Sequence, residues 1–347
     1  MDGYPVGYFT DEYGTSLEPS CQFEISINPY SDIDKIGRIY KEFIDLWEPI
    51  FSDLGYKLEK KGNLPLVELG AITPADIPLS HKKRYKYMDT YFKNSGRYGS
   101  YMMRASASTQ VSIDYKNEKD MVRKLRILEK ISPILMIIME SKTKEDSNLP
   151  GITGKPHLHR IQEWDDLDDA RTGFLKGSLD EDFNYDKMAD IILNTPLILF
   201  SKDGNTIDVG SKSAADLVKE NIIDVTADSE SIKNDIEHVM SMGFFHFRVK
   251  KYIEIRVADS VEINKALGYV ALIKGLFYDD SNLFALDEKL YNIKTIDEIN
   301  SAVEEIKKDG LDAVIYKGYT ARKWRNILKE IAINSLPENE KRYLEYI

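Results

Sequence analysis

Three segments that lie far apart in the sequence carry polar side chains that could act together. Gln22 and Glu24 form one pair two residues apart, Gln110 belongs to a second segment, and Glu254 and Arg256 form a third. Residues two apart in a β-strand point to the same face, so a sheet built from these segments would gather carboxylate, amide and guanidinium groups. Converging carboxylates need cations to neutralise them, and oxygen ligands suit Mg²⁺ or Mn²⁺. The pattern therefore indicates a metal–phosphate site, in which a nearby arginine stabilises a phosphoryl group or a substrate carboxylate.

Each segment also has an ordinary interpretation. Any antiparallel strand with one solvated face alternates polar and apolar residues in this way. The pair Glu254 and Arg256 favours a site, because its neighbours in sequence are densely apolar. The segment WDDLDDARTG at 164–173 holds four aspartates and is typical of a solvated loop. The sequence contains no P-loop, dinucleotide-binding glycine motif or nucleophile elbow, so an ATP site here would not be a P-loop.

The spacing of apolar residues predicts the elements that position these groups. Alternation predicts strands over 18–28, 103–115 and 244–259. Spacing of three and four residues predicts helices over 32–58, 117–140, 263–277, 295–308 and 320–333. Asp32 is the expected cap of the first helix, and Pro133 is expected to kink or break the second. This order of polar-faced strands and long helices favours an α+β fold with an antiparallel sheet.

Composition and charge exclude several classes of protein. The chain has 347 residues with 47 Lys+Arg and 58 Asp+Glu, and its formal charge of −11 argues against a general nucleic-acid binder. Hydrophobic residues make up 42%, enough for a sizeable core. The longest apolar runs are too short to span a bilayer. The first residues do not form a secretory signal, and with a single cysteine the expected location is the reducing cytoplasm.

The cysteine and the closest pair of histidines could each carry chemistry. Cys21 lies in the first polar strand, and we interpret it as a packed small residue rather than a nucleophile, because no neighbour in sequence would activate its thiol. His157 and His159 would share one face of a strand. We interpret them as solvated loop histidines rather than a metal site, because no third ligand is near in sequence.

Five blocks of sequence, taken in order, carry a family resemblance. The blocks are SLEPSCQFEISINP at 16–29, KKRYKYM at 82–88, MMRASASTQVSID at 102–114, RIQEWDDLDDARTG at 160–173 and RVKKYIEIRVAD at 248–259. They resemble the glutamate–cysteine ligases of the plant and proteobacterial type, relatives of the carboxylate–amine ligases and of the glutamine synthetase fold. The resemblance implies a glutamine-synthetase-like antiparallel sheet funnel flanked by helices. It further implies a single ligase domain over 1–347, with a helical C-terminal part over 281–347.

The resemblance also implies an activity and roles for individual residues. The family uses ATP to form γ-glutamyl phosphate from glutamate and then lets the amine of cysteine displace phosphate, which is the first step of glutathione biosynthesis. Mg²⁺ would bridge the nucleotide and the carboxylates of Glu24 and Glu254, with Glu18 as a third ligand. Arg256 would counter the phosphoryl charge, and Asp259 would hold an ammonium group. The residues expected to line the substrate and nucleotide sides are Gln22, Arg84, Gln110, Trp164 and Arg171.

The chain departs from the family pattern at several positions. Ser20 and Cys21 replace glycines, Ser112 replaces an asparagine, and Ala105 stands where an arginine is expected, just after Arg104. The family's first strand, with two further metal-binding glutamates, has no counterpart in residues 1–15, so we expect this chain alone to bind Mg²⁺–ATP poorly. A γ-glutamyl ligase for another amine and a truncated non-catalytic relative remain alternatives. The expected partners are small molecules, not nucleic acid or membrane, and the chain is expected to be a monomer or homodimer.

Overall fold

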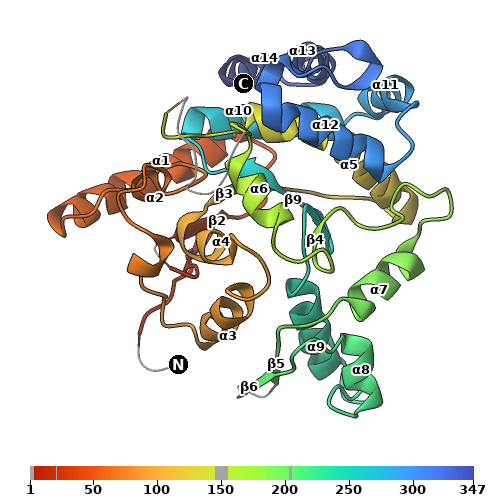
Figure 1. The fold of residues 1–347 in the computed structure, drawn as a ribbon. Helices are drawn as coiled ribbons and strands as arrows, with labels where there is room; N and C mark the ends of the chain where they lie inside the picture. Colours follow the sequence, from red (N-terminus) through yellow and green to blue (C-terminus); the bar gives the residue numbers. More distant parts are fainter. Residues whose placement is uncertain (1–3, 21, 145–154, 203–204) are drawn as a thin grey trace.

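A computed structural model describes residues 4–20, 22–144, 155–202 and 205–347. Helices and short strands alternate along the chain (Figure 1), which confirms the α+β class. The strands are β1 (Tyr13–Leu17), β2 (Phe23–Ile27), β3 (Ser108–Ile113), β4 (Thr172–Gly173), β5 (Leu199–Lys202), β6 (Asn205–Asp208), β7 (Phe244–Phe245), β8 (Phe247–Val249) and β9 (Ile253–Asp259). Cys21 lies outside the described residues.

The α-helices form most of the structure. They are α1 (Ile33–Asp53), α2 (Pro65–Glu68), α3 (Lys83–Phe92), α4 (Gly99–Ala105), α5 (Glu118–Ile138), α6 (His159–Asp165), α7 (Tyr185–Asn194), α8 (Ala214–Lys219), α9 (Ser229–Ser241), α10 (Ile263–Phe277), α11 (Asp280–Leu290), α12 (Ile296–Asp309), α13 (Ala321–Ala332) and α14 (Glu338–Lys341). Asp32 caps α1 as predicted, because its carboxylate accepts the backbone N–H groups of Asp34 and Lys35. The helix α5 runs through Pro133 without interruption, so the expected break does not occur.

The strands form several small sheets. The central one has the order β3–β9–β8 and is antiparallel, with Ser112 opposite Glu254. The pair β1–β2 is a separate antiparallel sheet, β5–β6 is a hairpin, and β4–β7 is a parallel pair. Two of the three predicted polar strands therefore pair directly, while β2 pairs with β1 instead.

Two predicted strands have different bounds in the structure. Residues 103–105 end the helix α4, and the strand β3 begins only at Ser108. The predicted strand over 244–259 is divided into β7, β8 and β9, and β8 and β9 form a hairpin. The polar residues Lys250 and Lys251 interrupt the apolar alternation where this hairpin turns, and Lys250 N–H donates to the carbonyl of Tyr252.

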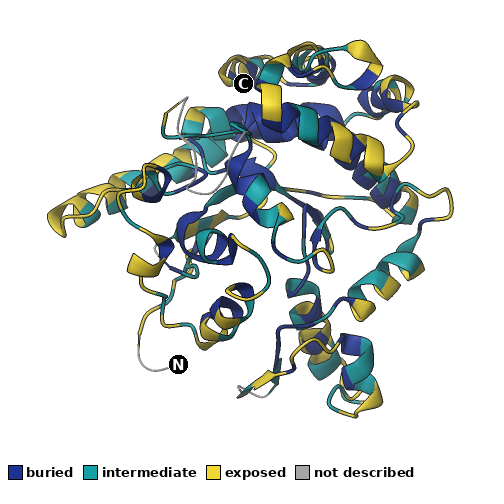
Figure 2. Cartoon of the chain, in the orientation of Figure 1, coloured by how far each residue is buried: buried dark blue, intermediate teal, exposed yellow. Residues whose placement is uncertain are grey.

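The core lies between the central sheet and two buried helices. Helices α5 and α10 pack against β9 and β3, and α12 and α13 cover their other side. Figure 2 shows α5 and α10 largely in the colour of buried residues. Ten of the fifteen residues of α10 are apolar and two more are glycines, which suits a helix enclosed on nearly all sides.

A second apolar cluster lies apart from this core. It joins α3 and α4 to β5, α8 and α9, and its largest members include Phe92 and Phe200. Figure 1 shows α7, α8, α9 and the β5–β6 hairpin together at the lower right. Within the described ranges, no helix is both long and apolar enough to cross a bilayer.

Candidate functional site

The β8–β9 hairpin builds a cluster of charges around one carboxylate. Arg248 lies directly opposite Glu254 in the hairpin register. Its Nε donates to Glu254 Oε2 at 3.1 Å, and its Nη2 donates to Oε1 at 2.9 Å. Arg256, two residues along the same face, donates through Nη1 to Glu254 Oε1 at 2.6 Å, and Lys250 Nζ lies 3.3 Å from Oε2. We call Arg248, Lys250, Glu254 and Arg256 the Glu254 cluster.

The Glu254 cluster is buried and carries excess positive charge. Glu254 is only 6% exposed. Burial disfavours its ionised form, but Arg256, Arg248 and Lys250 together lower its pKa to about 2. Burial and the adjacent Arg248 lower the pKa of Arg256 to about 10. Three cations face one carboxylate, so the cluster can accept a further anion such as a phosphate or a carboxylate.

Glu24 and Glu18 lie on the facing β1–β2 ribbon. The exposed Glu24 accepts a hydrogen bond from Ser26 Oγ at 3.2 Å. Surrounding protein atoms and the charge of Glu18 raise the pKa of Glu24, and the charge of Arg256 opposes this shift. Glu18 accepts from Tyr85 Oη at 2.9 Å and from Ser16 Oγ at 2.8 Å. The structure thus places Glu24 within electrostatic range of both Glu18 and the Glu254 cluster.

These carboxylates differ in their fitness to bind a cation. No three histidine, cysteine, aspartate or glutamate side chains of the described residues are arranged to hold a metal ion. Both oxygens of Glu254 already accept from arginine, so Glu254 does not fit the predicted role of metal ligand in this arrangement. Glu24 fits it better, because a cation would relieve the repulsion from Glu18 that raises its pKa.

Gln110, Gln22 and Arg84 lie near these groups in different ways. Gln110 is exposed on β3, and its Oε1 lies 3.4 Å from Arg256 Nη1, so this predicted neighbour is brought to the cluster. Gln22 precedes β2, and among the described residues its amide bonds to backbone groups, including Nε2 to the carbonyl of Ser106 at 3.0 Å. Arg84 is exposed and donates to Tyr85 Oη at 3.1 Å, which links it indirectly to Glu18.

Arg171 and Trp164 make their contacts with residues outside the Glu254 cluster. Arg171 is fully buried, its Nε donates to Asp168 Oδ2 at 2.6 Å, and its Nη2 donates to Tyr91 Oη at 3.0 Å. Trp164 packs against Phe244 with ring centroids 5.8 Å apart. No hydrogen bond or ion pair within the described ranges joins either residue to the Glu254 cluster. Their role beside substrate stays a prediction.

The aspartate-rich segment 164–173 is a solvated loop only in part: residues 166–171 form turns and Asp169 is exposed, but three of its aspartates form ion pairs. Asp165 bonds to Lys307 Nζ at 2.7 Å, Asp166 to Arg97 Nη2 at 2.9 Å, and Asp168 to Arg171. The solvated-loop interpretation therefore holds for the exposed Asp169 but not for the paired aspartates. These ion pairs tie α6 and the chain after it to segments up to 142 residues away in sequence.

Asp259 belongs to a buried polar network on the other side of β9. Its Oδ2 accepts the backbone N–H of Ser141 at 2.9 Å, and its Oδ1 lies 3.9 Å from Arg160 Nη1. Burial raises the pKa of Asp259 to about 7. Arg160 also donates to the carbonyl of Arg256 at 3.1 Å, so this network contacts the backbone of the Glu254 cluster.

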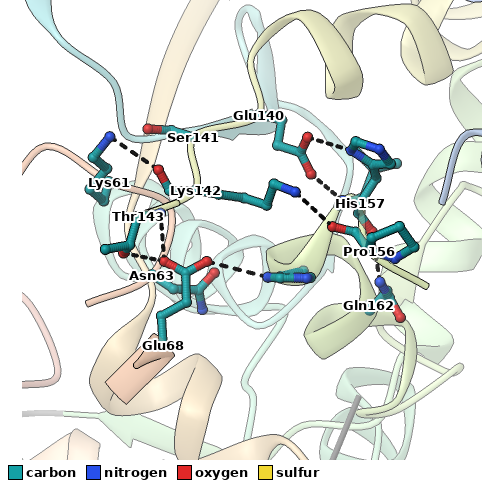
Figure 3. A network of polar contacts seen from close by, with 12 residues as sticks. Lys61, Asn63, Glu68, Glu140, Ser141, Lys142, Thr143, Pro156, His157 and Gln162 are labelled. Atoms are coloured by element: carbon teal, nitrogen blue, oxygen red, sulfur yellow. Dashed lines mark hydrogen bonds and ion pairs between the residues drawn. The ribbon is translucent and has the colours of Figure 1, made fainter. Parts of the chain in front are cut away.

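Further carboxylates are buried beside Arg160. Glu163 is completely buried and accepts from Asn63 Nδ2 at 2.5 Å, and burial raises its pKa well above the usual range. Glu68 accepts from the backbone N–H of Thr143 at 2.8 Å and lies 3.3 Å from His159 Nδ1. Figure 3 shows Glu68, Asn63 and Thr143 gathered at one side of this network.

Of the two histidines interpreted as solvated loop residues, His157 is half-buried in a bend before α6, and His159 is buried within α6. His159 is 2% exposed at the start of α6, and His157 pairs with Glu140 through Nδ1 at 2.8 Å (Figure 3). Leu158 between them has a left-handed backbone, with φ of 59°, so the strand interpretation does not apply. Both histidines serve instead to join α6 to distant segments.

A family model for glutamate-cysteine ligase family 2 matches residues 9–347. The chain belongs to this family. Among curated relatives, it is 26% identical over 329 residues to the chloroplastic glutamate–cysteine ligase B of Oryza sativa subsp. japonica, covering 94% of this chain and 63% of the relative. It is 27% identical over 281 residues to the chloroplastic glutamate–cysteine ligase of Nicotiana tabacum, covering 80% and 51%. The chain thus spans about half to two thirds of the length of these relatives.

Within this member of glutamate-cysteine ligase family 2, sequence reasoning missed Arg248, Arg160 and Glu163 as neighbours of the predicted site. Arg248 could have been found, because a turn at Lys250 and Lys251 places it opposite Glu254. Arg160 and Glu163 carry no such local signal. They meet Asp259 and Asn63 only through tertiary folding.

Proposed function

We propose that this chain belongs to an ATP-dependent ligase that joins the γ-carboxylate of L-glutamate to the amine of L-cysteine, the first step of glutathione biosynthesis. The family match over residues 9–347 supports this reaction. The observation that carries it in the structure is the excess positive charge of the Glu254 cluster. Such a cluster suits a substrate that carries a phosphoryl group during the reaction.

The proposed reaction has two steps. An oxygen of the γ-carboxylate of glutamate attacks the terminal phosphorus of ATP, ADP leaves, and γ-glutamyl phosphate forms. The amine of cysteine then attacks the γ-carbonyl carbon, the bond from that carbon to the phosphate oxygen breaks, and the amine loses a proton. Arg256 and Arg248 are placed to counter the negative charge that grows on the phosphate.

The other residues have supporting roles in this proposal. Glu24, with Glu18 beside it, would hold Mg²⁺, which would neutralise charge on the nucleotide phosphates. Gln110 and Arg84 remain predicted contacts of substrate or nucleotide. Asp259 was predicted to hold a substrate ammonium group, but its 8% exposure suits a positioning residue better than a direct contact.

A specific observation keeps another acceptor amine open. Ala105 stands where the family resemblance implies an arginine, and the neighbouring Arg104 is buried. Arg104 donates to both carboxylate oxygens of Asp89, at 3.0 and 2.8 Å. This arginine is therefore committed to the fold, and the guanidinium expected at this place is not supplied to a substrate. The second candidate is a γ-glutamyl ligase for a different amine.

The test is phosphate release from ATP by the purified chain with Mg²⁺ and glutamate, with cysteine or one of a panel of other amines. Mass spectrometry of the product identifies the acceptor. Weak cysteine-dependent release with formation of γ-glutamylcysteine is the expected result, because we expect this chain alone to bind Mg²⁺–ATP poorly. Release with another amine only would select the second candidate. No release with any amine from a folded chain would favour the non-catalytic relative.

The location and assembly of the chain are also proposals. We propose a cytoplasmic location, although the names of the plant relatives include the word chloroplastic. We further propose that the chain acts as a monomer or homodimer on small molecules. Fractionation of the source cells and the mass in solution would test these points.

A further inference from the structure

A groove of about 550 Å³ lies outside the Glu254 cluster. It is formed by the first half of α5, the end of α11 with the residues after it, and the segment before α7. Its lining residues include Val122, Ile127, Lys130, Phe183, Leu290 and Lys294. Figure 1 shows α5, α11 and α7 toward the right of the molecule, whereas β2 and α3 lie toward the left. The groove shares no residue with the proposed ligase site.

The groove has more cations than acids, although the whole chain has a charge of −11. The cations that line it are Lys119, Arg123, Arg126, Lys130 and Lys294, and the acids are Glu118, Glu181 and Asp287. Two of these acids are already engaged. Asp287 accepts from Arg123 Nε at 2.7 Å, and Glu118 accepts the backbone N–H of Tyr185 at 2.6 Å.

Lys130 is a groove cation without a direct hydrogen-bond or ion-pair partner among the described residues, and its side chain is half-buried. Burial and the nearby charge of Lys294 lower the pKa of Lys130. The adjacent Glu129 does not compensate, because burial raises its pKa to about 8 and its Oε2 already accepts from Ser178 Oγ at 2.6 Å.

Lys294 also lacks a carboxylate partner for its side chain within the described ranges. Its Nζ lies over the ring of Tyr291, 3.6 Å from the centroid. The nearby Glu298 is used by the backbone N–H groups of Lys294 and Thr295, at 2.8 and 2.9 Å. Asp287 and Glu298 attract Lys130 electrostatically, but neither forms an ion pair with it, and the groove lining still holds five cations against three acids. This excess of positive charge favours the binding of an anion.

We propose that this groove binds a small organic phosphate monoester, with its phosphate between Lys130 and Lys294 and its apolar part against the exposed ring of Tyr291. A dianionic phosphate matches two ammonium groups. The Tyr291 side chain is 65% exposed in this groove and offers contact area that inorganic phosphate could not use. The volume is sufficient for a ligand of this size.

The test is titration of the chain with phenyl phosphate and with inorganic phosphate, followed by isothermal calorimetry at constant ionic strength. The original chain should bind phenyl phosphate more tightly than phosphate. Lys130→Met should weaken phenyl phosphate binding at least tenfold, and it should fold normally because it removes an unpaired half-buried charge. Lys294→Met, in an exposed segment, should weaken binding as well.

Two control variants show where the probe binds. Lys289→Met removes the same charge from the exposed side of α11 and should bind as the original chain does. Arg256→Gln removes a cation of the Glu254 cluster and should keep the groove-dependent binding, whether or not the ligase proposal is correct. Unchanged binding in both lysine variants of the groove would overturn the proposal. Loss of binding only in Arg256→Gln, or no binding of phenyl phosphate by the original chain, would also overturn it.

Discussion

The two candidate metal carboxylates can be separated by matched Glu→Gln substitutions. In Glu254→Gln the side chain keeps its shape but loses the charge that Arg248, Lys250 and Arg256 surround. The pKa of Glu254 falls from an ordinary 4.5 to about 2 in the folded chain. A difference of about 2.5 corresponds to ~3 kcal/mol, at 1.36 kcal/mol for each pKa unit. We expect Glu254→Gln to lose about this much free energy of unfolding at pH 7.

The pH dependence gives this prediction its sign. A carboxylate whose pKa is lowered on folding stabilises the fold above its unfolded pKa, and this stability is lost as the pH falls through the folded pKa. The difference between the original chain and Glu254→Gln should therefore be full at pH 7 and should shrink between about pH 4.5 and pH 2. Urea unfolding at pH 7 and pH 4 would measure it.

Glu24→Gln should behave in the opposite way. The pKa of Glu24 is raised in the fold, so removing its charge should not destabilise the chain at pH 7. It should instead weaken Mg²⁺ binding measured by calorimetry, which Glu254→Gln should leave nearly unchanged. Asp312→Asn breaks an exposed ion pair with Arg322 and should cost less than about 1 kcal/mol, as a control for loss of charge. The reasoning fails if Glu254→Gln unfolds like the original chain and loses Mg²⁺ binding.

Three further predictions concern the core and the site network. Burial raises the pKa of Glu129 to about 8, and Glu129→Gln mimics its protonated form. The variant should gain up to ~3 kcal/mol of unfolding free energy at pH 7 and almost none near pH 4.5, because the original glutamate opposes folding only where its unfolded form is ionised. An equal difference between variant and original chain at both pH values would contradict this. Gly62→Ala should lower the free energy of unfolding by about 1–3 kcal/mol, because the added Cβ would lie 2.5 Å from Asp259 Oδ2. An unchanged urea midpoint would show that the two groups move apart without cost. Asp32→Ala should lower the thermal midpoint by an amount equivalent to about 1 kcal/mol through loss of the α1 cap, and Asp32→Asn should restore most of it.

Local patterns in the sequence predicted the parts of the structure that depend on near neighbours. The capped helix α1, the apolar helix α10 and the alternation in β2 all follow from spacing within one segment. The expectation that one sheet gathers three polar segments is met for β3 and β9, which bring Gln110 to Arg256, but not for β2, which lies in another sheet.

The missed features depend on turns and on contacts between distant segments. Treating 244–259 as one strand hid Arg248, because a straight strand does not place it opposite Glu254. The helical residues 103–105 were missed because their apolar neighbours suit either a strand or a helix over such a short run. Glu163 and Asn63 are 100 residues apart, and no periodicity reports such a pair.

The separation of the β1–β2 ribbon from the central sheet affects how the site is held together. Glu24 and Glu254 are on different sheets, so strand hydrogen bonds do not fix the distance between them. Aromatic packing of Phe23 on Phe43 and Trp47 anchors the ribbon to α1, which in turn packs on α10. At that helix contact, a Cβ on Gly37 would lie 3.0 Å from Leu267 Cδ1. The contact between α1 and α10 therefore helps to set where the β1–β2 ribbon lies, and we expect a methyl group added at Gly37 to shift the ribbon without altering any charge of the site.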